Sequence, residues 1–286
     1  MSAIITLTTD FGHKDHYVGS MKGRLLSENR DFIIVDISHE IDVFNVHEAS
    51  YVIGAAYKNF PKGTVHLIGV DCERTPFTKH VVMLWQDQYF IAADNGVLSF
   101  LTHKYKAEKI YEINIHHLYD EATDAMDILL VVASHIAKGG SLDVIGREIK
   151  ELKEVKVVQA HVAADHSALY GTVIYIDHYG NCITNISRPM VKDIAKGRDY
   201  YISFGTKKIA RVHKTYSDFL VPDEEKLKQK EGDVLALFNS NQNLEIAIYK
   251  SNPKTIGGAK SLFGLTVGST ITVNFVDFIK NTLVNS

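Results

Sequence analysis

The chain begins with an apolar segment that ends on an acidic residue and a glycine. Residues 4–9 are apolar or β-branched, Asp10 follows them, and Gly12 precedes a segment with apolar residues at helical spacing. This pattern predicts a strand over 4–9 and a helix over 15–27. Because open α/β sheets bind ligands beyond the carboxyl ends of their strands, Asp10 is a site candidate. A turn or helix-capping role would also suit an aspartate.

Strands and helices continue to alternate through the first half of the chain. The other expected strands, all of them apolar runs, cover 33–37, 64–70, 80–85 and 89–93, the first of them buried and the last two forming a hairpin. The other expected helices cover 45–57, with Asn45 as N-cap, and 125–138, closed by Gly139-Gly140. Residues 1–160 are therefore predicted to form an α/β domain with a Rossmann-like layered sheet.

The pattern changes at a charged segment around residues 150–154. Beyond it, helix signals are few, and the expected strands cover 169–176, 200–204, 233–238, 244–249 and 270–275. We therefore predict a second, mainly antiparallel and β-barrel-like domain over residues 168–286.

Composition narrows the ligand class. The net charge of −3 provides no basic surface for nucleic acid or anionic membrane, so we expect a small neutral or cationic ligand. Two cysteines are too few for a disulfide framework and lack zinc-site spacing. No segment has the length and apolarity of a membrane span or secretion signal. These features predict a cytoplasmic protein with neither a nucleic-acid nor a membrane partner.

Four polar groups stand where predicted strands give way to loops. They are Asp10-Phe11-Gly12, Asp71-Cys72-Glu73-Arg74, Asp94-Asn95-Gly96 and Asp177-His178-Tyr179-Gly180-Asn181. Each one alone is commonly a turn. Three of them in one α/β domain favour a shared site, because the loops at one edge of a sheet converge.

These residues also carry a family resemblance. The matching motifs, in chain order, are Thr8-Thr9-Asp10-Phe11-Gly12, Met21-Lys22-Gly23, Val35-Asp36-Ile37-Ser38-His39, Val65-His66-Leu67-Ile68-Gly69-Val70-Asp71, Asp94-Asn95-Gly96, Asp177-His178-Tyr179-Gly180-Asn181, Thr215-Tyr216-Ser217-Asp218 and Asn239-Ser240. In this order they resemble the S-adenosylmethionine hydrolases, or hydroxide adenosyltransferases, which are related to halogenases that make fluoro- and chloro-adenosine.

The resemblance implies hydrolysis of S-adenosylmethionine to adenosine and methionine by attack of water on ribose C5′. It also implies a homotrimer, with each ligand held between the first domain of one subunit and the second domain of its neighbour. No cofactor and no metal are expected, because a neutral thioether leaves a sulfonium without acid or metal assistance.

The resemblance assigns the residues their roles. Those expected around the water are Asp71, Arg74 and Asp124. Those expected to contact substrate are Asp10 and Phe44 at the ribose, Tyr179, Asn181, Ile183 and Tyr216 at the adenine, Asp177 at the ammonium group, and Asn95, Ser240 and Asn241.

The chain departs from the family at the chemistry itself. The family's Asp is followed by Pro-Gly-Val-Gly and then Glu-Arg, whereas here Asp71-Cys72-Glu73-Arg74 omits most of that loop. Asp124 also occupies the position of the family's catalytic histidine. His116 or His117 would replace it if the intervening loop folds back, while His135 is expected to be structural. Alternatively, Asp124 and Asp71 would share a proton.

Two other functions remain open from sequence. A non-catalytic protein would keep the adenosine pocket and bind the nucleoside or its sulfonium without turnover. A metal-dependent hydrolase would use Asp10, Asp71, Asp94 and some of the histidines. Against the second, the histidines show neither His-x-His nor His-Glu-x-x-His spacing.

Overall fold

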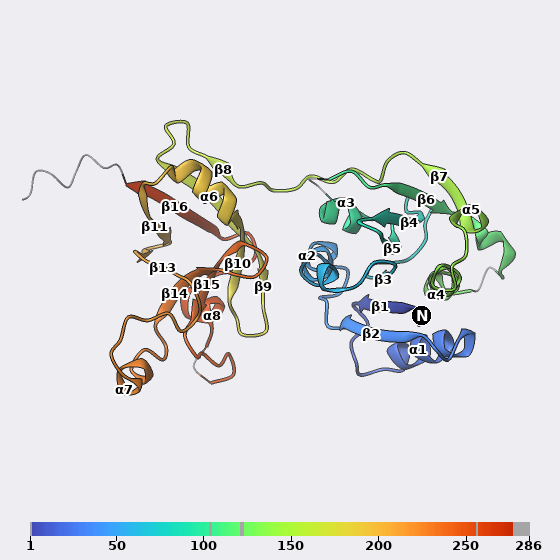
Figure 1. Ribbon diagram of the computed structural model, residues 1–286, viewed down its shortest axis with the longest axis horizontal. Coiled ribbons are helices and arrows are strands. Elements are labelled where there is room, and N and C mark those ends of the chain that lie inside the picture. The colour runs from blue at the N-terminus through green and yellow to red at the C-terminus, as the bar shows by residue number, and fades with distance from the viewer. Residues whose placement is uncertain (1, 103–104, 121–122, 256, 277–286) are drawn as a thin grey trace, which may run out of the picture. The chain divides into compact units, whose positions relative to one another are not determined.

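The computed structural model describes residues 2–102, 105–120, 123–255 and 257–276 (Figure 1). It divides into two compact units, residues 1–157 and residues 158–286. The sequence predicts domains over 1–160 and 168–286. Each unit contains its own sheet and its own hydrophobic core.

The first unit alternates strands with helices. Its strands are β1 (Ile4–Thr9), β2 (Ile33–Ser38), β3 (Val65–Gly69), β4 (His80–Trp85), β5 (Gln88–Ala93), β6 (Lys109–Ile113) and β7 (Gly146–Ile149). Its helices are α1 (Tyr17–Glu28), α2 (Val46–Ala56), α3 (Val97–Thr102), α4 (Ala125–Ala137) and α5 (Leu142–Ile145), with 3₁₀ turns η1 (Tyr57–Asn59) and η2 (Ile115–Leu118).

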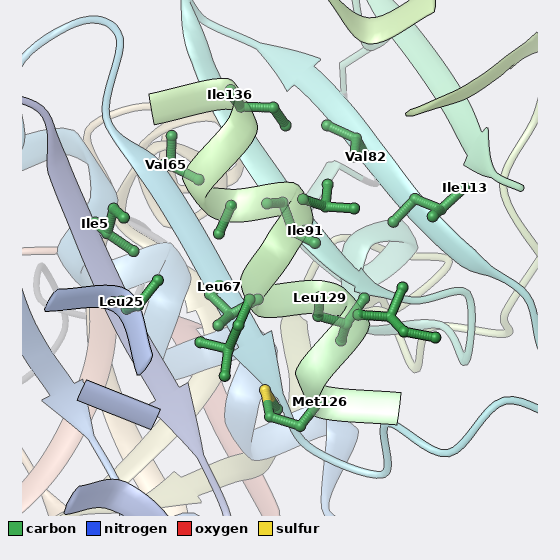
Figure 2. Close-up of a cluster of buried hydrophobic side chains, with 14 of the residues drawn as sticks. Ile5, Leu25, Val65, Leu67, Val82, Ile91, Ile113, Met126, Leu129 and Ile136 are labelled. Carbon is green, nitrogen blue, oxygen red and sulfur yellow. The ribbon is translucent and has the colours of Figure 1, made fainter. Parts of the chain in front are cut away.

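The seven strands form one mixed sheet in the order β2-β1-β3-β5-β4-β6-β7. The β2-β1-β3-β5 part is parallel, and the remaining pairs are antiparallel. Residues of α1 and α4 pack on one face, and residues of α2 and α3 pack on the other. Figure 2 shows Leu129 of α4 among strand residues such as Leu67 and Ile91. This α/β layering confirms the predicted class of the first domain.

Local sequence signals account for most of these elements. The Asn45 side chain accepts a hydrogen bond from the amide of Glu48 and so caps α2, as predicted. The 80–85 and 89–93 runs form the predicted hairpin of β4 and β5. The expectation that β2 is buried is wrong, because β2 is an edge strand and Ile33 is 48% exposed.

The second unit is mostly strands. They are β8 (His161–Val162), β9 (Ala168–Ile176), β10 (Cys182–Ser187), β11 (Asp199–Phe204), β12 (Lys207–Ile209), β13 (Val212–His213), β14 (Val234–Phe238), β15 (Asn243–Ile248) and β16 (Thr270–Val276). Its helices are α6 (Arg188–Ala195), α7 (Glu224–Lys228) and α8 (Ala259–Phe263).

The second sheet runs β12-β11-β16-β9-β10-β15-β14-β13, with β8 paired to β9. All its pairs are antiparallel except β13 with β14, which confirms a mainly antiparallel, barrel-like domain. Sequence reasoning missed α6, although Ser187 caps it through the amide of Met190 and Pro189 stands in its first turn. Within the described residues, every helix is too short or too polar to cross a membrane.

Candidate functional site

The carboxyl ends of β1, β3 and β5 lie at one edge of the first sheet. The parallel register sets Thr9 beside Gly69 and Leu67 beside Ile91. Asp10 and Asp71 therefore leave neighbouring strands at nearly the same level, and Asn95 leaves the next strand beside them. The three polar groups that the sequence places at strand ends in this domain share one edge.

Asp10 organises the loop that follows β2. Its Oδ2 accepts a hydrogen bond of 2.9 Å from the amide of Phe44. Phe44 has φ of +62°, a left-handed conformation that is unfavourable for a bulky residue, and its ring is 69% exposed. Asp10 thereby holds the backbone of an exposed aromatic residue.

A buried histidine supports the turn beneath Asp10. Nδ1 of His39 and Oγ1 of Thr9 share a hydrogen bond of 2.7 Å. The main-chain carbonyl of His39 accepts a hydrogen bond from the amide of Gly12. Its Nε2 lies 3.2 Å from Asp36, which Lys22 also contacts. Burial lowers the pKa of His39 despite the carboxylate beside it. Thr9, before Asp10, and Gly12, after it, are thus both hydrogen-bonded to His39.

Asp71 lies in a loop whose backbone is hydrogen-bonded to the side chain of Asn95. Its φ is +46°, again left-handed. Nδ2 of Asn95 donates to the carbonyls of Val70 at 3.0 Å and Asp71 at 2.9 Å, while Oδ1 of Asn95 accepts from the amide of Val97. Asn95, predicted to contact substrate, therefore uses both amide hydrogens to hold the Asp71 backbone.

Several acidic residues influence the buried thiol of Cys72. The pKa of the buried Cys72 thiol is raised to about 12, first by burial and then by the negative charges of Glu73, Asp10 and Asp124. Asp124 is exposed and occupies the N-cap position of α4, but its side chain makes no capping hydrogen bond. Its carboxylate is available at the edge that carries Asp71.

Gly69 allows α4 to approach the end of β3 closely. A Cβ atom on Gly69 would lie 2.2 Å from Cε of Met126, the second residue of the helix. Gly69 is the last residue of β3, directly before Val70 and Asp71. The absence of a side chain there lets the first turn of α4 pack against the strand end.

The histidines considered as substitutes for the family's histidine have different surroundings. Nε2 of His135 lies 2.9 Å from the carbonyl oxygen of Ser141. Because a carbonyl oxygen only accepts, His135 is the donor. The exposed His117 bonds the carbonyl of Asn114 in the same way. His116 instead faces His80. The exposed Arg74 lies near both of those rings, because its charge contributes to the lowered pKa of each.

The Asp94 carboxylate is already hydrogen-bonded within the protein. Both of its carboxylate oxygens accept from the amide of Lys153, and burial raises its pKa. Within the described ranges, no group of three or more His, Cys, Asp or Glu side chains is arranged to hold a metal ion. The set proposed for a metal-dependent hydrolase is not assembled there.

In the second unit, Asp177 shapes its own hairpin loop. Its Oδ1 accepts from the amides of Tyr179 and Asn181, and its Oδ2 accepts from the Asn181 side chain. Gly258 packs so closely that a Cβ there would lie 2.5 Å from the Tyr179 carbonyl oxygen. The loop is rigid at its base, while the Tyr179 side chain is 62% exposed.

A buried carboxylate lies beside that loop. Ile183 and Glu245 are cross-strand partners on β10 and β15, and Glu245 is only 2% exposed. The Tyr216 hydroxyl donates to Glu245 over 2.5 Å. Burial, followed by the charge of Asp177, raises the pKa of Glu245 above its ordinary value. Sequence reasoning missed Glu245, because it stands inside the apolar run of β15.

The turn that carries Ser240 and Asn241 is organised by Asn239. The Asn239 side chain accepts from the amides of Asn241 and Asn243, and its Nδ2 lies 3.3 Å from Glu245. Ser240 is exposed and Asn241 is partly exposed. The predicted binding residues of this unit thus surround Glu245 on neighbouring strand ends.

Comparison with known proteins supplies a family for both units. The model of the SAM hydroxide adenosyltransferase N-terminal domain matches residues 5–146, and that of the C-terminal domain matches residues 171–272. An (R)-S-adenosyl-L-methionine hydrolase of Methanocaldococcus jannaschii is 34% identical over 194 residues, 66% of this chain and 68% of that protein.

Two further proteins are also similar to this chain. A fluorinase of Nocardia brasiliensis is 27% identical over 235 residues, 71% of this chain and 76% of that protein. A crystal structure of an uncharacterized conserved protein from Thermotoga maritima superposes with a TM-score of 0.80 at 30% identity, covering 95% of this chain and 99% of the other.

Proposed function

The chain belongs to the SAM hydroxide adenosyltransferase family, and from that premise we propose that it hydrolyses S-adenosyl-L-methionine to adenosine and L-methionine. The relatives named as (R)-S-adenosyl-L-methionine hydrolases support this activity. The structural observation that carries the proposal is the meeting of Asp10 and Asp71 at one edge of the sheet, where β1 and β3 pair with Thr9 beside Gly69 and Asn95 holds the Asp71 backbone.

The proposed reaction is a displacement at ribose C5′. A water oxygen bonds to C5′ while the bond from C5′ to the sulfonium sulfur breaks, and that electron pair stays on sulfur as the neutral thioether of methionine. The water proton passes to a carboxylate or to solvent. The leaving group needs no protonation, so the protein has to place and partly desolvate the water. We propose that no cofactor and no metal take part.

Three residues are proposed to act on the water. Asp71 orients it, with Arg74 beside it, and Asp124 supplies a carboxylate where the family has an imidazole. An ionised carboxylate accepts hydrogen bonds only, which suits the holding of a water whose oxygen lone pair faces C5′. The water-activating group is thus altered relative to the family.

The binding residues fall into two sets. Asp10 is proposed to accept the ribose hydroxyls and Phe44 to lie against the ribose ring, which fits the hydrogen bond that the Phe44 amide donates to the Asp10 carboxylate. In the second unit, the proposed contacts are Tyr179, Ile183 and Tyr216 around the adenine, Asn181 as its hydrogen-bonding partner, Asp177 at the ammonium group, and the main chain at Ser240 and Asn241.

We extend the proposal to assembly and location. A homotrimer would hold each ligand between the first unit of one subunit and the second unit of its neighbour, consistent with six of the candidate residues on the first unit and seven on the second. The parallel β2-β1-β3-β5 strands with ligand groups at their carboxyl ends support a Rossmann-like first domain. Two buried free thiols, Cys72 and Cys182, support a cytoplasmic location.

The test is turnover in isotopically labelled water. Purified protein is incubated with S-adenosylmethionine in H₂¹⁸O, and the products are identified by mass spectrometry. The proposal requires adenosine with one ¹⁸O at the 5′ oxygen and an equal amount of methionine. Asp71→Asn is the matched inactive control. Saturable binding by calorimetry without any product would instead establish the non-catalytic binding protein.

A further inference from the structure

Two histidines outside the predicted site lie directly beneath the Asp71 loop. Nε2 of His80 is 2.8 Å from the carbonyl oxygen of Cys72, and Nδ1 of His80 is 2.9 Å from Nε2 of His116. His80 is fully buried at the first position of β4, and His116 lies in η2. Neither belongs to the motifs that carry the family resemblance.

The strand register explains why these side chains meet. His80 pairs with Ala93 on β5, two residues before Asn95. Val81 pairs with Glu112 on β6, and η2 follows directly after β6. Neighbouring strands therefore deliver Asn95 and His80 to one loop, while the next strand delivers His116 behind His80.

Hydrogen-bond chemistry fixes the direction of this chain of contacts. A carbonyl oxygen only accepts, so His80 carries its proton on Nε2 and donates it to Cys72. Nδ1 of the neutral His80 ring is then an acceptor, and His116 must donate from Nε2. Nδ1 of neutral His116 is left as an unprotonated lone pair, and it is buried without a hydrogen-bond partner in the described part of the chain.

The surroundings keep both rings neutral. Burial is the largest cause of the lowered pKa of each histidine. The pKa of His116 is lowered to about 4 by burial, then by His80, Arg74 and His117, against an opposing contribution from Glu112. A proton on either ring would set a second positive charge near Arg74.

The loop that contains Asp71 is held by hydrogen bonds from side chains on neighbouring strands and loops. Three consecutive carbonyls, those of Val70, Asp71 and Cys72, accept hydrogen bonds from Asn95 and His80. The central residue is Asp71, which has a positive φ. A non-glycine residue keeps such a conformation only where its surroundings hold it in place.

We propose that His80 and His116 are positioning residues that hold the Asp71–Arg74 loop in its reactive arrangement. His80 does so by clamping the Cys72 carbonyl, and His116 by fixing the tautomer and orientation of the His80 ring. This inference rests on the proposed function, because it gives the loop the task of orienting the attacking water. It assigns His116 a role behind the loop instead of that of the missing catalytic histidine.

The experiment compares donor-removing with donor-keeping variants. His80→Leu and His116→Leu remove the donors, whereas His80→Gln and His116→Gln keep an amide N–H at the end of the side chain. Leu118→Ala, a change at an exposed residue of the same 3₁₀ turn, is the matched control. For each purified full-length protein, kcat and KM for S-adenosylmethionine are measured, together with hydrogen exchange of peptides that cover residues 70–75.

We expect the two Leu variants to lower kcat by more than tenfold with KM changed by less than threefold, and to raise exchange at residues 70–75 by more than tenfold. On a logarithmic scale, the two Gln variants recover at least half of the loss in kcat, and Leu118→Ala matches the wild type. Unchanged kcat and exchange in His80→Leu, or a Gln variant as impaired as its Leu counterpart, overturns the proposal. If the wild type makes no adenosine, the proposed function fails, whereas unchanged exchange in the Leu variants defeats the positioning role by itself.

Discussion

The amide of Phe44 donates a 2.9 Å hydrogen bond to Oδ2 of Asp10, across 34 positions of sequence. One carboxylate thus holds a loop residue with positive φ and remains at the edge of the sheet where a ligand is expected. Asp10 therefore has one task towards the protein and, in the proposed function, a second towards the ribose. Substitutions separate them because the two tasks need different chemistry.

Asp10→Asn keeps an oxygen that accepts from Phe44 but loses the negative charge and one acceptor. We expect it to weaken binding of S-adenosylmethionine by about 10- to 100-fold, from loss of a charge-assisted hydrogen bond of roughly 1.5–3 kcal/mol. Asp10→Ala loses the Phe44 contact as well and should weaken binding further. Calorimetry measures both, and equal affinity in wild type and Asp10→Asn would contradict the ribose assignment.

Asp124→His tests the altered water-activating group. Because the Asp124 side chain does not cap α4, its replacement should change the free energy of unfolding by less than about 0.5 kcal/mol. We expect turnover to rise towards that of the family. A quantitative adenosine assay at several pH values is the measurement, with Asp127→Asn as a control at the residue that pairs with Arg24. Turnover that stays at the wild-type level would place Asp124 away from the water.

Gly69→Ala tests the close approach of α4. The new methyl group would overlap Cε of Met126, and overpacking of this kind costs roughly 1–3 kcal/mol of stability. The displaced helix should also lower kcat. In a Met126→Ala background the methyl group has room, so the same change should cost less than half as much. Urea denaturation of the four proteins gives this cycle, and equal costs in the two backgrounds would refute the proposed clash.

Tyr216→Phe removes a donor to the buried Glu245. The loss should lower the unfolding free energy by roughly 1–3 kcal/mol, because a buried carboxylate loses a hydrogen bond. Tyr170→Phe, on a ring that stacks with His161, is the matched control and should have little effect. Denaturation followed by circular dichroism makes the comparison. Equal midpoints for the two variants would show that the Tyr216 hydroxyl does not stabilise Glu245.

His66 should make stability depend on pH. The ring is buried between Thr6 and Gln88, and burial lowers its pKa from 6.5 to about 4. Between these values the unfolded chain binds the proton and the folded chain does not. Stability therefore falls as pH drops from about 6.5 to about 4, by an amount on the order of 3 kcal/mol, and this contribution is flat outside that range.

Denaturant midpoints at pH 7.5, 6, 5 and 4 measure this dependence. In His66→Gln the part due to one proton should disappear, so the slope of stability against pH becomes shallower. Parallel curves for variant and wild type would rule out His66 as a histidine that is buried in its neutral form.

Sequence patterns predicted the strand ends well, because hydrophobic periodicity and turn residues are local signals. Asp10 and Asp71 were identified in this way. The task of Asn95 was not, because it depends on the register between β3 and β5. The contact of His80 with His116 depends in the same way on β4 and β6. Glu245 was missed because its donor, Tyr216, lies 29 residues earlier in the chain.

The buried character of β2 was misjudged for a related reason. A mostly apolar pentapeptide reads the same whether its strand is central or at an edge, and only the sheet order distinguishes the two. Short helices in the second unit were also missed, since α7 and α8 have five residues each and offer little periodicity.

The hydrogen bonds from Asn95 and His80 to the carbonyls of residues 70–72 have an evolutionary consequence. A backbone that is held by its neighbours does not need a particular sequence or length beyond the held residues. Glu73 and Arg74 lie beyond the held carbonyls and are exposed, so we expect changes in the length of this segment to leave Asp71 in place. Variation in this segment would then diversify the family around a constant carboxylate.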